Sequence, residues 1–147
     1  MKNYKIILLT NFVMAFTAFT TISQNNPTTL DKLQANTWEH KSSLSRTHTA
    51  VYDAEQVVNY LNGEKSMIYE YYLSDRIDTV FDETKIGQLP NGKYLVKRSK
   101  TSIDDGIEKE VTVPNRFGVF EIKQLNRNWL ALRYIKHRHS VKYKAVD

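Results

Sequence analysis

His137 and His139 are the two side chains of this sequence whose spacing best suits a metal ion. On an extended strand, residues two positions apart project from the same face and can bind one ion together. Lys136 and Arg138 alternate with the histidines, and their positive charges oppose the binding of a cation. The pattern therefore favours two solvated histidines in a turn, and we predict no metal site and no cofactor.

The other residue types with catalytic chemistry form no recognisable motif. The chain has no cysteine, which excludes a thiolate nucleophile and a disulfide framework. It also lacks the serine-elbow, zinc-helix and phosphate-loop motifs of common enzyme classes. Asp75, Asp78 and Asp82 lack the alternating ligand order of a calcium loop. We predict no catalytic residue and no enzyme activity; the alternative is a hydrolytic pair of carboxylates that folding brings together.

Tyrosine is the residue type best suited to ligand binding here, with nine copies in the chain. A tyrosine ring is apolar while its hydroxyl forms hydrogen bonds, which suits the wall of a ligand cavity. Period-two alternation places Tyr69, Tyr71 and Leu73 on one face of a strand. We predict that Tyr69, Tyr71 and Tyr134 bind a ligand; the alternative is that they are ordinary half-buried strand residues.

Charge is unevenly distributed along the chain, which carries a formal net charge of +5. Basic residues dominate between Asn115 and Asp147, whereas acidic residues gather between Glu70 and Glu110. Solvated faces of neighbouring strands account for this pattern, and a basic surface for an anionic partner is the alternative. Because the net charge is small, we predict no nucleic-acid partner.

Short runs of β-branched and aromatic residues alternate with turn residues over most of the chain, and this pattern predicts strands. Asn62-Gly63 favours a tight hairpin because both residues tolerate positive φ. Before the first strand, residues 28–33 are expected to form one helical turn capped by a hydroxyl. The predicted strands span residues 37–44, 47–53, 56–61, 66–73, 76–81, 93–98, 117–124, 129–136 and 140–146, with a weaker one at 107–113.

The connections between these strands are too short for crossover helices, so neighbouring strands must be antiparallel. The fold class is therefore all-β: an antiparallel meander that closes into a small barrel, preceded by one short helical turn. The last three strands must pair in chain order. Most of the C-terminal core is expected to comprise Phe117, Val119, Phe120, Ile122, Leu130, Leu132, Tyr134, Val141 and Tyr143.

Residues 1–23 have the layout of a secretory signal peptide. Lys2 and Lys5 precede an uncharged apolar run that ends in small residues. We predict cleavage before Gln24, a single domain over residues 24–147, and an exported product in the periplasm or outside the cell with no stable membrane anchor. The alternative is a retained membrane helix. A bacterial lipid anchor is excluded because its attachment needs a cysteine.

Two segments give the domain a likeness to a known family. The helical turn leads into a first strand with a tryptophan (Leu33–Trp38), and a later strand has the pattern Leu-x-Leu-x-Tyr (Leu130–Tyr134). Over residues 30–146 the chain resembles the small lipocalin-like domains of bacterial envelope proteins. The resemblance implies a lipocalin-like barrel whose interior holds a small apolar molecule, and it implies no catalytic residue.

The tryptophan of the first strand carries a structural prediction. We expect Trp38 to be buried at the closed end of the barrel, with Arg133 or Arg138 stacked over its ring. A desolvated cation–π contact of this kind stabilises a fold by roughly 1–2 kcal/mol. Trp38 and Arg133 are therefore predicted to be structural residues.

Two functions remain open. The first is an exported, non-catalytic binding protein that holds a small apolar molecule. The second is a protein-interaction module, such as an inhibitor or an immunity protein, that acts on a protein partner through a basic face. An apolar cavity open at one end of the barrel favours the first, whereas a filled barrel with a basic patch on the last two strands favours the second.

Overall fold

The fold is that of a computed structural model, which describes residues 26–111, 113 and 116–146 of the 147-residue chain. Strands dominate its regular structure, together with one α-helix and one short 3-10 helix in this described part. The elements are α1 (Thr29–Gln34), β1 (Thr37–Lys41), β2 (Thr47–Tyr52), β3 (Gln56–Leu61), β4 (Glu64–Ser74), η1 (Glu83–Lys85), β5 (Tyr94–Asp104), β6 (Ile107–Glu110), β7 (Phe117–Leu125), β8 (Trp129–Tyr134) and β9 (Ser140–Val146).

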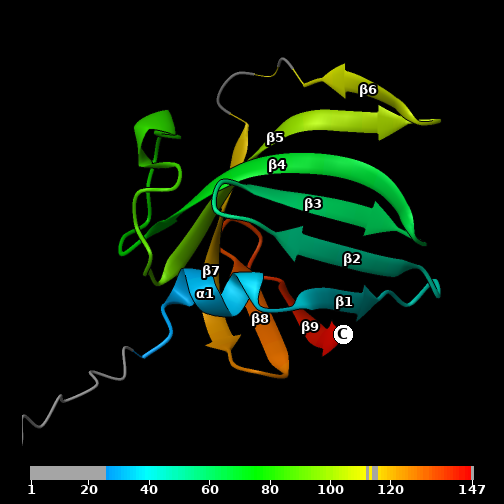
Figure 1. Cartoon of the computed structure of the whole chain (residues 1–147). Coiled ribbons are helices and arrows are strands. Elements are labelled where there is room, and N and C mark those ends of the chain that lie inside the picture. The colour runs from blue at the N-terminus through cyan, green and yellow to red at the C-terminus, as the bar shows by residue number, and fades with distance from the viewer. Residues whose placement is uncertain (1–25, 112, 114–115, 147) are drawn as a thin grey trace, which may run out of the picture.

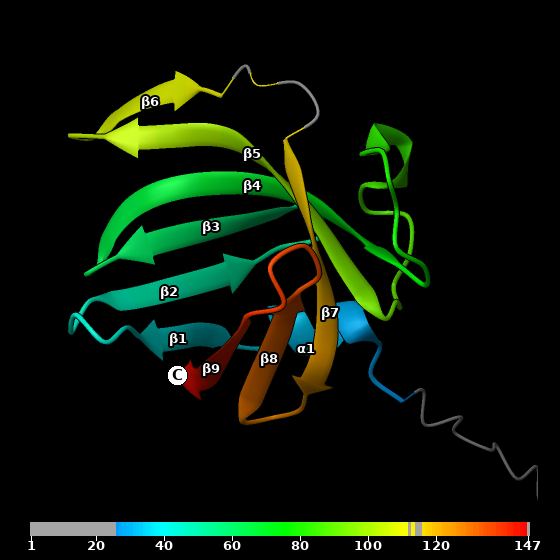
Figure 2. The same cartoon turned by 180° about the vertical axis from the view of Figure 1, so that it is seen from behind.

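The strands close into a barrel in which every pairing is antiparallel. Hydrogen-bonded neighbours follow the order β4-β3-β2-β1-β9-β8-β7-β5, and β4 also pairs with β5, which joins the two ends of the sheet. β6 lies outside this ring and pairs with the far end of β5 (Figure 1). Seen from behind, β7, β8 and β9 complete the wall opposite β1–β4 (Figure 2). The predicted all-β antiparallel barrel with a short N-terminal helix is confirmed, as is the pairing of the last three strands in chain order.

Helix α1 closes one end of the barrel. Its first turn is a capping box, in which the Thr28 hydroxyl accepts from the Asp31 N–H and the Asp31 carboxylate accepts from the Thr28 N–H. Leu33 of the helix is fully buried and belongs to the same core as Trp38 of β1. Neither α1 nor any other helix in the described residues is long and apolar enough to cross a membrane.

Trp38 is fully buried beside this helix, as predicted. Its indole N–H donates a 2.9 Å hydrogen bond to the Leu33 carbonyl, which satisfies the polar atom of the ring. The prediction of an arginine over the ring is wrong. Arg133 projects from the outer face of β8, because its neighbours on both sides face inward, and it pairs with Glu121. Arg138 lies in the exposed turn between β8 and β9, whereas Trp38 lies beside the opposite end of β9.

Two tight hairpins contain the same kind of turn. Asn62 and Gly63 connect β3 to β4 with φ values of 52° and 87°, as the sequence predicted. Asp105 and Gly106 connect β5 to β6 with φ values of 49° and 75°, and this turn was not predicted. Positive φ at both central positions matches the right-handed twist of the paired strands, so these turns fix the register of both hairpins.

The predicted strand at residues 76–81 is absent. Residues 75–93 leave the sheet after β4 and form a long loop around η1, which stands at the side of the barrel (Figures 1 and 2). Phe81 of this loop packs against Tyr72 and Val96, which face outward from β4 and β5. The apolar residues that suggested a strand instead cover the outside of the sheet, because that part of the sheet is itself apolar.

The predicted C-terminal core divides between the barrel interior and this outer cluster. The interior takes Phe120, Ile122, Leu130, Leu132 and Tyr143. Phe117 and Val119 lie in the outer cluster instead, because they project from the opposite face of β7. Tyr134 and Val141 are half-buried and line a cavity on the side of the barrel away from α1.

Candidate functional site

β5 carries a lysine into the barrel interior. Leu95 belongs to the interior core, and side-chain alternation places Lys97 and Ser99 on the same face of the strand. In the sheet, Lys97 lies opposite Tyr71 of β4 and Gly118 of β7. A charged side chain therefore projects inward at a point where one of its two neighbours has no side chain.

Aromatic rings surround the ammonium group of Lys97. Its Nζ lies 4.6 Å from the ring centroid of Tyr69 and 4.8 Å from that of Phe120, within the range of cation–π contacts. Phe120 in turn stacks on Tyr134, with ring centroids 4.9 Å apart. Gly118 permits this arrangement, because a Cβ atom there would lie 2.7 Å from the Phe120 ring.

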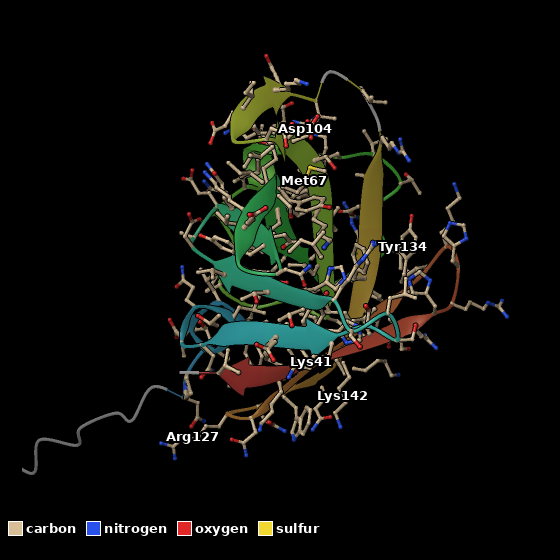
Figure 3. All side chains as sticks on the ribbon, turned by 90° about the vertical axis from the view of Figure 1, so that its right-hand side faces the viewer. Lys41, Met67, Asp104, Arg127, Tyr134 and Lys142 are labelled. Atoms are coloured by element: carbon tan, nitrogen blue, oxygen red, sulfur yellow. The ribbon has the colours of Figure 1, made fainter. Side chains whose placement is uncertain are left out.

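A cavity of about 260 Å³ opens beside these rings. It forms because pairing between β5 and β7 ends at Arg98 and Phe117, beyond which β5 pairs with β6. A second, inner cavity of about 20 Å³ is also bordered by Lys97, together with His139 and Tyr143. The residues that line the larger cavity are Tyr69, Lys97, Ser99, Arg116, Phe117, Gly118, Phe120 and Tyr134, the last of which is labelled in Figure 3.

Two of the three tyrosines predicted to bind a ligand meet at this cavity. Tyr69 and Tyr134 both line it, from β4 and β8. Tyr71 does not reach it, although it shares the inward face of β4 with Tyr69. It is 1% exposed in the core, where its hydroxyl donates a 2.5 Å hydrogen bond to the Asp53 carbonyl and its ring meets the edge of Tyr52. Tyr71 is therefore a core residue on the side nearer the closed end.

Burial lowers the pKa of Lys97 from its usual 10.5 to about 8. The side chain as a whole keeps some exposed area, but the rings enclose its ammonium group. The pKa falls because this enclosure removes water from the ammonium, which destabilises its charged form. No acidic side chain of the described residues pairs with Lys97. At pH 7.4, a pKa near 8 leaves about a fifth of the amine neutral, against about one part in a thousand for an ordinary lysine.

Two of the phenols that border the cavities next to Lys97 stay protonated at neutral pH. Burial raises the pKa of Tyr69 and of Tyr143 above the usual value for a phenol. Both therefore offer neutral hydroxyl groups rather than phenolate anions. The larger cavity thus combines the enclosed amine of Lys97 and the guanidinium of Arg116 with the neutral hydroxyl of Tyr69, and its described lining includes no acid.

Two other partly buried cations, Arg98 and Lys85, have partners of opposite sign. Arg98, which projects from the outer face of β5, pairs with Glu70 and with Glu83 of η1. Lys85 pairs with the buried carboxylate of Asp78 at 2.8 Å. Ion pairing of this kind offsets the cost of removing a charge from water. Lys97 differs from these groups because aromatic rings, not an anion, contact its ammonium.

The two histidines of the metal-like pattern lie at the rim of the same region. His137 and His139 occupy the exposed turn after β8, with ring centroids 5.1 and 5.6 Å from that of Tyr134. His40 and His48 face each other across β1 and β2, with centroids 6.2 Å apart. Within the described residues, no three His, Cys, Asp or Glu side chains are grouped so that they would hold a metal ion.

A basic face, defined by Lys41, Arg127, Lys142 and Lys144, lies on the outside of the barrel. Lys142 and Lys144 are exposed on β9, and the Lys142 Nζ lies 4.2 Å from the ring centroid of Trp129. Figure 3 shows Lys41, Arg127 and Lys142 toward the same side of the molecule. The last two strands therefore carry a basic surface as well as part of the cavity wall.

Sequence reasoning did not select Lys97, the central residue of this site. The alternation of Leu95, Val96 and Lys97 contained a signal, because Lys97 shares a face with Leu95. That signal is ambiguous, since Leu95 and Val96 are both 0% exposed and β5 is buried on two faces. Pairing with β7 and coverage by the loop decide which face is the interior, and neither can be read from the strand itself.

Comparison with known proteins adds no family to these observations. No protein-family model, curated protein or solved structure gives a significant match to the chain. The function is therefore inferred from the chemistry of the site.

Proposed function

We propose that this domain is an exported, lipocalin-like binding protein without catalytic activity, which holds a small apolar molecule with an acidic head group beside Lys97. The observation that carries the proposal is the Lys97 ammonium, which lies among aromatic rings inside the barrel and has no acidic partner in the described residues. Arg116 adds a second positive charge to the lining of the cavity.

The physical argument is that an enclosed charge without a counter-charge is costly. A ligand carboxylate would supply that counter-charge and accept a charge-assisted hydrogen bond, which is stronger where water is excluded. The rings of Tyr69, Phe120 and Tyr134 would cover the hydrocarbon part of the ligand. Small-molecule sites generally have this composition, with apolar walls and a few polar groups that fix orientation.

The size of the cavity limits the ligand. Its volume of about 260 Å³ lies just below the range of about 300–1,000 Å³ that is usual for ligand pockets. The interior beyond it is filled by the core that includes Tyr71, Leu95 and Leu132. A single aromatic ring or a short aliphatic chain therefore fits this site better than a long lipid.

Calorimetric titration with 3-phenylpropionate tests the head group, with 3-phenylpropionamide as the neutral ligand of matched shape. We expect the acid to bind at least about ten-fold more tightly than the amide, because a charge-assisted hydrogen bond contributes roughly 1.5–3 kcal/mol. Lys97→Met should remove this preference: the affinity for the acid should fall at least about ten-fold, while the affinity for the amide should change little.

Lys100→Met is the matched control, because Lys100 is exposed on the outer face of the same strand. This variant should bind the acid as the wild-type protein does. Equal affinity for acid and amide, or an acid affinity that Lys97→Met leaves unchanged, would contradict the proposed role of Lys97.

Export is the part of the proposal that rests on residues 1–23, which lie outside the described residues. Their charge and apolar pattern supports cleavage before Gln24. N-terminal sequencing of the protein from fractionated cells of its own host is expected to begin at Gln24 in the periplasm or medium. A protein that keeps Met1 and stays in the cytoplasm would refute export.

The second candidate function is a protein-interaction module. Two observations favour it: the barrel interior beyond the cavity is filled by the core, and exposed Lys142 and Lys144 of the basic face flank the half-buried ring of Trp129. Aromatic and basic side chains together are common at protein interfaces. Native mass spectrometry of the protein from its own host separates the two functions, since a ligand adds a small mass and a protein partner adds a whole chain.

A further inference from the structure

Lys97 combines three properties that together define a reactive amine. Its Nζ is held over the rings of Tyr69 and Phe120, it borders the 260 Å³ cavity, and no acid of the described residues contacts it. Lysines on the outside of the barrel lack this setting; Lys65, for example, is exposed and pairs with Glu108 at 3.0 Å. A desolvated lysine in an apolar pocket is a recognised nucleophile toward carbonyl carbon.

We propose that Lys97 captures small aldehydes as a reversible imine, with the hydrocarbon part of the aldehyde lying in the cavity between Tyr69, Phe120 and Tyr134. This inference rests on the proposed function of the same cavity as a small-molecule site, and it adds carbonyl compounds to the ligands of that site.

The chemistry needs no group beyond the amine, the aldehyde and water. The lone pair of the neutral Lys97 Nζ forms a bond to the carbonyl carbon, and the carbonyl π electrons move to oxygen, which takes a proton. Nitrogen loses one proton as the carbinolamine forms, which balances the proton that oxygen took. The carbinolamine hydroxyl then takes a second proton and leaves as water, while the nitrogen lone pair forms the C=N bond and nitrogen releases its second proton to solvent. One amine and one aldehyde thus give one imine and one water, with no oxidation or reduction.

Two features of the site favour this step. Burial lowers the pKa of Lys97 to about 8, so the fraction of neutral amine at pH 7.4 is about two hundred times that of an ordinary lysine. Gly118 lies directly opposite Lys97 and has no side chain, so the Phe120 ring of the same strand reaches the amine and helps to enclose it. The two cation–π contacts stabilise the charged form less than an ion pair would, and no acid of the described residues pairs with Lys97.

Reductive trapping tests the proposal. The mature chain is incubated at pH 7.4 with benzaldehyde and sodium cyanoborohydride, which reduces an imine to a stable secondary amine, and peptide mass mapping locates the label. We expect Lys97 to be labelled at least ten-fold faster than any other lysine. Lys97→Arg keeps a positive charge but forms no imine under these conditions, and it should lose the fast labelling. Lys100→Arg should retain it.

The outcomes separate the imine from the proposed function. Labelling spread evenly over the lysines would overturn imine capture, and if 3-phenylpropionate still binds, the proposed acid site stands. Failure of both the trapping and the binding of 3-phenylpropionate would overturn both. Fast labelling of Lys97 that 3-phenylpropionate slows would support imine capture and place both ligands at the same amine.

Discussion

Replacing Trp38 with alanine is expected to lower the free energy of unfolding by about 3–5 kcal/mol, because it leaves a cavity in a core that does not collapse fully. The ring is 0% exposed and packs where helix α1 closes the barrel. A loss of this size is a large share of the roughly 5–15 kcal/mol that stabilises an ordinary domain. Urea unfolding followed by far-ultraviolet circular dichroism measures it.

Two further variants separate the causes of this loss. Trp38→Phe keeps a ring but removes the indole N–H, which leaves the Leu33 carbonyl without its 2.9 Å partner and should cost about 1–3 kcal/mol. Trp129→Ala is the matched control, since Trp129 is half-buried on the outer face and should cost less than about 1 kcal/mol. Equal losses for Trp38→Ala and Trp129→Ala would refute the assigned role of Trp38.

Replacing Lys97 with methionine is expected to raise the free energy of unfolding at pH 7 by about 2 kcal/mol while it weakens acid binding. The lowered pKa means that the folded state holds the lysine proton less tightly than the unfolded state. The full shift corresponds to about 3 kcal/mol. Partial exposure and the two cation–π contacts of Nζ reduce that figure, because both favour the charged form.

The dependence on pH identifies the cause. Well below pH 8, at about pH 6, the lysine is charged in both states, so the folded wild-type protein carries the whole cost of enclosing the charge. As pH rises from about 8 to 10.5, the unfolded state binds more protons than the folded state, and wild-type stability therefore rises. Tyr69 and Tyr143 do not affect the pH dependence near pH 8, because burial raises the pKa of each above its usual value and both stay protonated there.

Urea unfolding at pH 7 and pH 10 is the measurement, with Lys100→Met as the control. The gain from Lys97→Met should shrink at the higher pH, whereas Lys100→Met should change stability by less than about 0.5 kcal/mol at both. A loss of stability in Lys97→Met at pH 7, or a gain that does not depend on pH, would show that enclosing the charge is not what destabilises the wild-type protein.

The sequence predicted the parts of the fold that depend on local patterns. Alternation in residues 129–146 identified the last two strands and their inward faces, and Asn62-Gly63 identified a hairpin. The segment 76–81 resembled a strand because it contains Ile77, Val80 and Phe81. Its real role depends on an apolar patch that strands β4, β5 and β7 create together, and no local pattern reports that patch.

The site was only partly predictable for a related reason. Alternation correctly placed Tyr69 and Tyr71 on one face. It could not tell that α1 closes the end of the barrel nearer Tyr71, which leaves Tyr71 in the core and Tyr69 at the cavity. The inward direction of Lys97 depends on its pairing with Gly118. Arg133 was misplaced although alternation with Leu132 and Tyr134 puts it on the outer face of β8, where it pairs with Glu121 of the neighbouring strand. The depth of the two tyrosines and the inward direction of Lys97, by contrast, are set by contacts between residues that are distant in the sequence.

The end of β5 that extends past the barrel also affects how the molecule behaves at high concentration. Closing a barrel removes the free edges of its strands, but in the described residues β6 pairs only with β5 and leaves one edge unpaired. Such an edge is a template for association with another chain. β6 is only 4 residues long, and Glu108, Lys109 and Glu110 follow its exposed Ile107. A short, charged strand is a poor template, so the fold limits the risk of aggregation at the place where its sheet remains open.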